Sequence, residues 1–327
     1  MSTQLPVLKP KDFESDQDVR WCPGCGDYGI LAAMQFMHAE LAKDPATEIK
    51  SEDSVFISGI GCAARFPYYM DTYGMHTIHG RSPAIATGLA VARPDLNIWV
   101  VGGDGDMLSI GGNHLIHALR RNVNLTILLF NNQIYGLTKG QYSPTSEVGK
   151  VTKSTPAGSI DPPFNPISLA VGARATFVAR THDLDRKHMI DVFQQANAHR
   201  GASLVEIYQN CNVFNDGAFD AITKRANRAA MMIDLVEGEP IRFGADNEKG
   251  VVINNGRAEI VDVDDVGADG LLVHRADADP SVAFALAELA NDRQSPTAFG
   301  VFRAVESPEY TDAVEAQVAN AQADGRG

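Results

Sequence analysis

Two side chains with oxygen ligand atoms follow two apolar segments of this chain. Asp104 stands between two glycines directly after the run 98–102, and Asn132 comes directly after the run 125–130. A carboxylate and an amide oxygen are hard ligands of the kind that Mg²⁺ takes beside phosphates. Glycines let the backbone approach a phosphate, and the helix expected after this loop offers its N-terminus to negative charge. Each motif alone is an ordinary loop, but the pair at this spacing predicts a site for a Mg²⁺-bound diphosphate.

The loop around Asp104 also has some features of a dinucleotide-binding turn. Such a turn has a third small residue that lets helix and strand pack closely, and its pyrophosphate approaches between the glycines. The string from Gly103 to Leu108 lacks the third small residue and has Asp104 between its glycines. The sequence therefore favours a metal-bridged diphosphate over a nicotinamide cofactor.

The chain contains four cysteines, which are Cys22, Cys25, Cys62 and Cys211. The first two frame a Pro-Gly turn ahead of the first long helix, and the last two each follow a predicted strand. The carboxyl ends of parallel strands lie along one edge of a sheet, so the last two should converge there with Asp104 and Asn132. In a reducing compartment such a set predicts metal ligation rather than disulfides. By number alone, four thiolates suit a structural zinc ion or a [4Fe–4S] cluster.

Short apolar runs alternate with amphipathic stretches up to about residue 235. This alternation is typical of an α/β fold with a doubly wound, mostly parallel sheet. Runs bounded mainly by Gly, Asn or Pro predict strands at 54–58, 97–102, 124–130, 175–179 and 203–208. Apolar residues at helical spacing predict helices at 28–42, 83–92, 112–121, 167–171, 188–199 and 220–235.

The composition changes to Gly, Asp and Asn after residue 235, so we divide the chain into a main domain, 1–235, and a C-terminal appendage, 236–327. We expect a partly disordered tail after about Glu315. Within the main domain, the proline-rich segment 143–166 predicts a long loop. In the appendage the sequence predicts extended pieces at 251–254, 259–263 and 271–274 and a helix at 281–291.

Charge and hydropathy exclude several classes of partner. The net charge of −13 argues against a nucleic-acid-binding body, which needs a basic surface. The longest apolar runs are far shorter than a membrane span. The N-terminal segment has no apolar stretch after a basic head, so we expect a cytoplasmic protein.

Five motifs in the chain are Trp21-Cys-Pro-Gly-Cys-Gly26, Gly59-Ile-Gly-Cys-Ala63, His79-Gly-Arg81, Gly102-Gly-Asp-Gly105 and Asn131-Asn-Gln-Ile-Tyr-Gly-Leu-Thr-Lys-Gly-Gln141. Together they resemble the β subunit of 2-oxoacid:ferredoxin oxidoreductases, in particular of the 2-oxoglutarate type. The resemblance spans about residues 15–240. The stretch Phe299-Gly-Val-Phe-Arg303 is also similar to the family's C-terminal end.

This resemblance implies the thiamine-diphosphate-binding fold and a set of cofactors: thiamine diphosphate, Mg²⁺ and one [4Fe–4S] cluster. The cluster ligands that it implies are Cys22, Cys25, Cys62 and Cys211. The implied Mg²⁺ ligands are the side chains of Asp104 and Asn132 and the backbone carbonyl of Ile134. The residues expected to contact thiamine diphosphate are Ile60, Gly61, Cys62, Ala63, His79, Gly80, Gly105, Asp106, Gly136 and Leu137.

The reaction implied by the resemblance is the oxidative decarboxylation of a 2-oxoacid. The thiamine ylid attacks the keto carbon, CO₂ leaves, electrons pass singly through the cluster to ferredoxin, and coenzyme A collects the acyl group. Run in reverse, the same reaction fixes CO₂. Ylid formation needs a glutamate from a pyrimidine-binding domain, which we do not find in this sequence. The resemblance therefore implies an α or fused γα partner subunit and a heterotetramer built from two such pairs.

Arg65 and His79 are the candidate catalytic residues. Arg65 lies three residues after Cys62 in a loop expected to face the cluster and the thiazolium, where a guanidinium could bind a distal carboxylate with two hydrogen bonds. This predicts 2-oxoglutarate as the substrate and succinyl-CoA as the product. Pairing of Arg65 with an acidic neighbour or the partner chain is the alternative, and pyruvate or a branched-chain 2-oxoacid would then fit equally.

Two other classes of function fit parts of the pattern. A non-redox thiamine-dependent decarboxylase or lyase would hold zinc in the cysteines. A non-catalytic binding module would hold a metal at Asp104 and Asn132 for stability alone. Iron in the cysteines excludes the first, and binding of thiamine diphosphate in the presence of the partner excludes the second.

Overall fold

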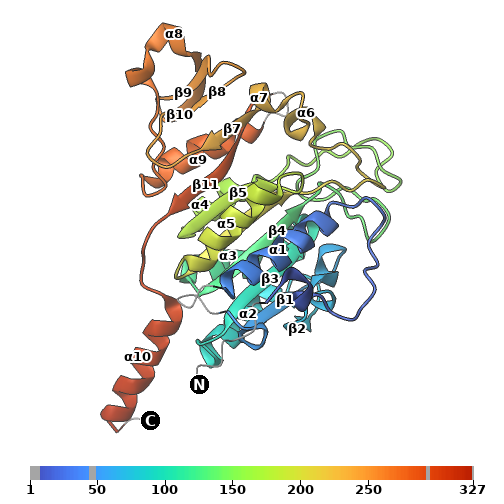
Figure 1. Ribbon diagram of the computed structural model, residues 1–327, viewed down its shortest axis with the longest axis vertical. Coiled ribbons are helices and arrows are strands. Elements are labelled where there is room, and N and C mark those ends of the chain that lie inside the picture. The colour runs from blue at the N-terminus through green and yellow to red at the C-terminus, as the bar shows by residue number, and fades with distance from the viewer. Residues whose placement is uncertain (1–7, 44–48, 292–294, 326–327) are drawn as a thin grey trace.

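The structure is a computed structural model that describes residues 8–43, 49–291 and 295–325. Its centre is an eight-stranded sheet in the order β2-β1-β3-β4-β6-β5-β11-β7 (Figure 1). The first six strands in this order are parallel, β11 is antiparallel to β5, and β7 is parallel to β11. The predicted doubly wound, mostly parallel α/β fold is therefore confirmed. The strands are β1 Ser54–Ser58, β2 Tyr73–His76, β3 Asn97–Gly103, β4 Leu125–Asn131, β5 Phe177–His182, β6 Ala202–Tyr208, β7 Met232–Leu235 and β11 Thr297–Ala304.

Helices form a layer on each face of the sheet. The helices α1 and α5 pack on one face, and α2, α3, α4 and α9 pack on the other. Within the described residues, none of the helices has the length and apolar character needed to cross a membrane. The helices are α1 Asp27–Leu41, α2 Ser82–Ala92, α3 Gly112–Arg121, α4 Pro166–Gly172, α5 Arg186–Ala198, α6 Asp220–Thr223, α7 Arg228–Met231, α8 Val263–Val266, α9 Pro280–Glu288 and α10 Tyr310–Ala323.

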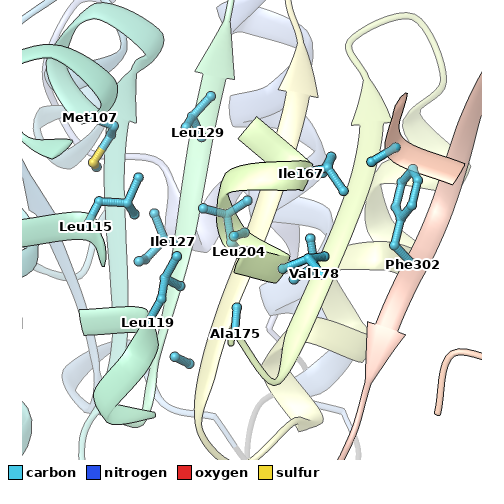
Figure 2. Packing of buried hydrophobic residues seen from close by; sticks show 14 of the residues in the cluster. Met107, Leu115, Leu119, Ile127, Leu129, Ile167, Ala175, Val178, Leu204 and Phe302 are labelled. Carbon is cyan, nitrogen blue, oxygen red and sulfur yellow. The ribbon is translucent and has the colours of Figure 1, made fainter. Parts of the chain in front are cut away.

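Side chains that alternate along a strand pack into the two helical layers. Val55 and Ile57 of β1 belong to the apolar cluster under α2 and α3, whereas Phe56 belongs to the cluster under α1 and α5. Phe56 stacks on Trp99 of β3, with ring centroids 6.0 Å apart. Figure 2 shows part of the first cluster, with side chains from α3, β4, β6 and β5. A strand that is buried on both faces has a continuous apolar sequence. This is why the apolar runs of the sequence predicted the strands.

Residues 220–235, which the sequence predicts as one helix, form three elements. The helix α6 ends at Thr223 because Lys224 has an extended backbone, with φ −61° and ψ 136°. One further turn forms α7, and β7 then pairs with β11. Ile233 of β7 is fully buried. The prediction of one continuous helix is wrong: Arg228–Met231 is helical, but the chain turns at 224–227 and Met232–Leu235 is a strand. Pairing with a strand far away in the sequence decides the conformation of this last part.

The C-terminal segment contributes to the main sheet as well as forming a small sheet of its own. The strand β11 and the helix α9 both pack in the main body. The small antiparallel sheet, β10-β9-β8, contains β8 Arg242–Phe243, β9 Lys249–Asn254 and β10 Arg257–Asp262. It confirms two of the three predicted extended pieces, whereas 271–274 has only an isolated bridge at Val273. The tail was expected to be partly disordered after about Glu315, but its residues up to Ala323 lie in helix α10.

Candidate active site

Four neighbouring parallel strands bring the predicted metal ligands to one edge. The strands β1, β3, β4 and β6 are consecutive in the sheet. Cys62 follows β1, Asp104 follows β3, Asn132 follows β4 and Cys211 follows β6. The carboxyl edge of a parallel sheet is where such folds bind ligands. The predicted convergence of these four residues therefore agrees with the observed strand order.

All four cysteines line one cavity of about 250 Å³, together with Asn132 and Gly136. Each is a free thiol. The absent side chain of Gly136 leaves room between two of them, since a Cβ there would lie 3.5 Å from Cys211 Sγ and 3.6 Å from Cys62 Sγ. The N-terminal pair is held near Cys211 by a hydrogen bond of 2.6 Å from Asn212 Nδ2 to the Pro23 carbonyl. Within the described residues, no group of three or more His, Cys, Asp or Glu side chains is arranged closely enough to hold a single metal ion.

The thiol cavity is unfavourable for negative charge in the absence of a cation. Burial raises the pKa of the Cys62 thiol to about 12, and the neighbouring Asp27 and Cys211 add to this shift. Burial and Asp27 also raise the pKa of the Cys25 thiol well above its usual value. Burial likewise raises the pKa of Asp27 to about 7. A cationic metal centre would remove this penalty by binding the thiolates, so the donor set fits a thiolate-ligated metal group.

Asp104 is the buried carboxylate at the diphosphate edge, with an exposed fraction of 2%. Its Oδ2 accepts hydrogen bonds of 2.5 Å from Ser143 Oγ and Thr145 Oγ1. Burial raises the pKa of Asp104 to about 6, although these two hydroxyls act in the opposite direction. Thr145 Oγ1 also lies 2.9 Å from Asn131 Oδ1. A buried carboxylate held by hydroxyls rather than by a basic side chain fits a ligand of a hard divalent cation.

Asn132 is oriented through both ends of its side-chain amide. Its Oδ1 accepts the backbone N–H of Ile134 at 3.2 Å, and its Nδ2 donates to Gln209 Oε1 at 2.8 Å. Tyr135 also contacts the neighbouring strand loop, because its hydroxyl donates to the Gly105 carbonyl at 3.0 Å. The loop after β4 is thereby fastened to the loops after β3 and β6.

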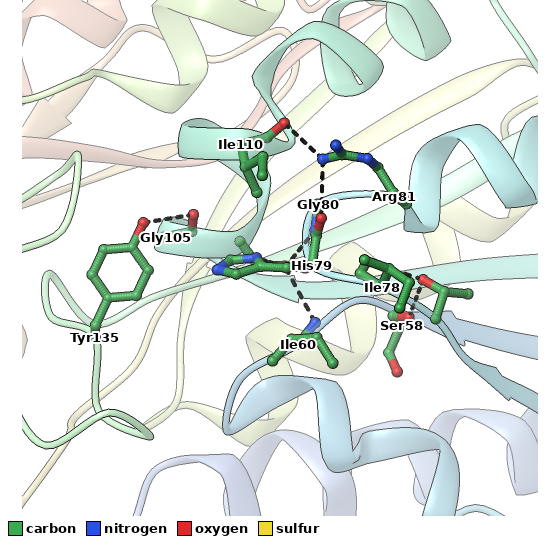
Figure 3. A network of polar contacts seen from close by, with 11 residues as sticks. Ser58, Ile60, Ile78, His79, Gly80, Arg81, Gly105, Ile110 and Tyr135 are labelled. Atoms are coloured by element: carbon green, nitrogen blue, oxygen red, sulfur yellow. Dashed lines mark hydrogen bonds and ion pairs between the residues drawn. The ribbon is translucent and has the colours of Figure 1, made fainter.

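Asp106 joins three loops through one oxygen atom. Its Oδ1 accepts the N–H of Gly80 at 2.7 Å and the N–H of Ile60 at 3.2 Å, and it also bonds to His79 Nδ1. Figure 3 shows how its partners Ile60, His79 and Gly80 lie close together. Arg81 fixes the same region by donating to the carbonyl of His79 at 3.1 Å. The Asp106 carboxylate therefore holds the loops that carry other predicted contact residues. Its own contact with the cofactor stays a prediction.

The other residues predicted to contact thiamine diphosphate lie either in a cavity wall or in the apolar core. Ile60, Gly61 and Leu137 line a cavity of about 630 Å³, which Arg65 also lines. Arg65 is a lining residue of the thiol cavity as well, so it stands between the two. In contrast, the Ala63 side chain is buried in the apolar cluster under α1.

Sequence reasoning missed several residues of this site, namely Asp27, Ser143, Thr145 and Gln209. Ser143 and Thr145 lie in the long proline-rich loop, where only a run of hydroxyl residues indicated a role. Asp27 lies two residues after Cys25, the last residue of the Cys-Pro-Gly-Cys turn, and this position was the available signal. Gln209 has no distinguishing pattern, because its side chain contacts two other loops as well as the next residue in its own loop.

Comparisons with known proteins agree with this geometry. Residues 59–207 match the family model of the thiamine pyrophosphate enzyme, C-terminal TPP binding domain. The chain is 58% identical over 315 residues to the 2-oxoglutarate oxidoreductase subunit KorB of Mycobacterium tuberculosis, covering 96% of this chain and 83% of that protein. The chain belongs to the β subunits of the 2-oxoacid:ferredoxin oxidoreductases. Subunit beta of the 2-oxoacid:ferredoxin oxidoreductase 1 of Aeropyrum pernix is 46% identical over 196 residues, 60% of each chain.

A solved structure of this family extends the likeness over nearly the whole chain. The 2-oxoglutarate:ferredoxin oxidoreductase of Magnetococcus marinus, with 2-oxoglutarate, coenzyme A and succinyl-CoA bound, superposes with a TM-score of 0.77 at 33% identity. The superposition covers 97% of this chain and 92% of that one. The chain is therefore a subunit of a thiamine-diphosphate-dependent oxidoreductase, and the family resemblance predicted from its motifs is confirmed.

We predict that Gly80→Ala weakens thiamine diphosphate binding by about tenfold. Gly80 has φ +69°, and a Cβ there would lie 2.5 Å from the Gly111 nitrogen, so the loop that reaches Asp106 must move. Backbone strain of this kind costs about 1–3 kcal/mol, and about 1.4 kcal/mol corresponds to a tenfold loss. Gly88→Ala in α2 is the matched control, since its Cβ meets nothing within 4 Å. Calorimetric titration of the assembled complex with the cofactor and Mg²⁺ measures both, and equal affinity in the two variants contradicts the role of this loop.

Proposed function

We propose that this chain is the β subunit of a 2-oxoglutarate:ferredoxin oxidoreductase and that it holds thiamine diphosphate, Mg²⁺ and a [4Fe–4S] cluster along one sheet edge. The observation that carries the proposal is the shared cavity, in which four thiols meet the Mg²⁺-ligand candidate Asn132. Thiamine diphosphate supplies the chemistry that decarboxylates a 2-oxoacid, and the cluster accepts electrons one at a time. A zinc ion in the same thiols offers no such electron acceptor.

The residues of the chain have separable roles in this proposal. Asp104, Asn132 and the carbonyl of Ile134 bind Mg²⁺, and the diphosphate lies beside the glycines of the loop after β3. Asp106 holds His79 and the loop of Ile60 in place. The four cysteines bind the cluster. The larger cavity, lined by Gly61 and Leu137 among others, is the place that we propose for the reacting end of the cofactor.

Arg65 supports 2-oxoglutarate as the substrate. Its partly buried guanidinium faces both cavities, and within the described parts of the chain it has no ion pair. No direct ion pair with an acidic neighbour is therefore formed there, although Asp16 and Asp18 line the same cavity. A dicarboxylate whose distal group reaches this cavity would supply the missing negative charge. The bacterial relative is named for the same substrate, and the solved neighbour contains it.

We infer that the active site is completed by a partner chain. The family name of the relatives describes a β subunit, which belongs with other subunits. We propose an α or fused γα subunit that brings the pyrimidine-binding domain, two such pairs in one heterotetramer, ferredoxin as the electron acceptor and coenzyme A as the acyl acceptor. The solved neighbour contains coenzyme A and succinyl-CoA.

We predict that the purified chain alone does not turn over 2-oxoglutarate, whereas the chain copurified with its partner does. The physical reason is that the glutamate that activates thiamine must come from the partner. Reduction of ferredoxin in the presence of coenzyme A and 2-oxoglutarate measures this under anaerobic conditions. Full turnover by the isolated chain would remove the need for a partner and contradict the proposed division of the site.

We predict that Arg65→Met lowers kcat/KM for 2-oxoglutarate by roughly ten- to a hundredfold, the loss of about 1.5–3 kcal/mol expected for a hydrogen bond to a charged group. The value for pyruvate should change far less, because pyruvate has no distal carboxylate. Arg93→Met is the control, since Arg93 is exposed and paired with Asp95 at 2.5 Å. If Arg65→Met reduces turnover of both substrates equally, the substrate assignment is wrong.

A further inference from the structure

Gln209 connects the two groups of predicted ligands, although no motif includes it. It follows β6 and is buried, with an exposed fraction of 1%. Its backbone N–H donates to the Asn131 carbonyl at 2.9 Å, which continues the pairing of β6 with β4. This backbone bond places the Gln209 side chain between the loop of Asn132 and the turn of Cys25.

The two ends of the Gln209 amide bind different partners. Its Oε1 accepts the hydrogen bond from Asn132 Nδ2 at 2.8 Å. Its Nε2 donates to Cys25 Sγ at 3.3 Å and to the Asn210 carbonyl at 2.6 Å. One side chain therefore contacts a candidate Mg²⁺ ligand and a candidate cluster ligand at the same time. Gln209 also lines the thiol cavity, so these contacts face the place where the two sites meet.

We propose that Gln209 is a positioning residue that couples the Mg²⁺ and thiamine diphosphate site to the cluster. The proposal rests on the function proposed above. An N–H donor to a cluster sulfur stabilises the more negative, reduced state and thus raises the reduction potential. The same side chain holds Asn132 by its amide nitrogen, which leaves the amide oxygen as the atom available to Mg²⁺. Loss of Gln209 should therefore affect the cluster and Mg²⁺ binding together.

The test uses Gln209→Met and Gln209→Leu in the complete, anaerobically purified complex. Both replacements fill the same space with apolar atoms, and neither donates a hydrogen bond to Cys25. Leucine also removes every acceptor for Asn132, whereas the methionine sulfur is at most a weak one. Gln195→Met is the matched control, because Gln195 lies on the exposed side of α5 and donates to Asp191 at 3.3 Å.

Two measurements are made on each variant: a reductive titration followed by the cluster's electron paramagnetic resonance signal, and a Mg²⁺ titration of thiamine diphosphate binding. We expect the one-electron reduction equilibrium to shift against the reduced cluster by up to about tenfold, or about 59 mV. We expect Mg²⁺ affinity to fall about ten- to a hundredfold, as for other residues that orient a metal ligand. The Gln195 variant should match the wild type in both.

An unchanged potential in both Gln209 variants with the cluster retained would overturn the coupling, and so would unchanged Mg²⁺ affinity. Loss of the cluster from both variants, with thiamine diphosphate still bound, would make Gln209 a requirement for assembly and would also overturn it. Failure of the proposed function itself is recognised separately, because the wild-type complex would then show no cluster signal to titrate.

Discussion

Parallel pairing of β1, β3, β4 and β6 is the constraint on which the site depends. These neighbouring strands end at one edge, so four loops from distant parts of the sequence meet there. The apolar runs that build the strands are buried on both faces by helices, which fixes their register and thus the positions of Asp104 and Asn132. Chemistry at this edge therefore rests on a rigid sheet, while the loops supply the variable contacts.

The candidate site also buries ionisable groups that have no positively charged partner. The carboxyl of Asp104 and the thiols of Cys25 and Cys62 all have pKa values raised chiefly by burial. Such an arrangement is costly for a chain by itself. Metal groups bound by these oxygen and sulfur atoms would offset the cost. The same groups perform the proposed chemistry, so the local instability of the site and its function have one physical origin.

The sequence predicted those parts of the molecule that depend on local patterns. The sequence indicated the buried strands β1, β3, β4 and β6 because each is a continuous apolar run. It indicated Asp104 because glycines stand on both sides of it. The strands β7 and β11 could not, since each is stabilised by pairing with the other across more than fifty residues. Gln209 was missed for the same reason. Its role is defined by contacts with the loop of Asn132 and the turn of Cys25, and no sequence spacing indicates these contacts.

The proposed function requires that the four thiols hold an electron-carrying cluster beside thiamine diphosphate. Anaerobic analysis of iron, acid-labile sulfide, zinc and thiamine diphosphate in the chain copurified with its partner tests it most directly. If the thiols hold such a cluster, each copy of this chain contains about four irons, four sulfides and one thiamine diphosphate. Stoichiometric zinc without iron in the anaerobic preparation would contradict it and would indicate a thiamine enzyme whose cysteines only support the fold.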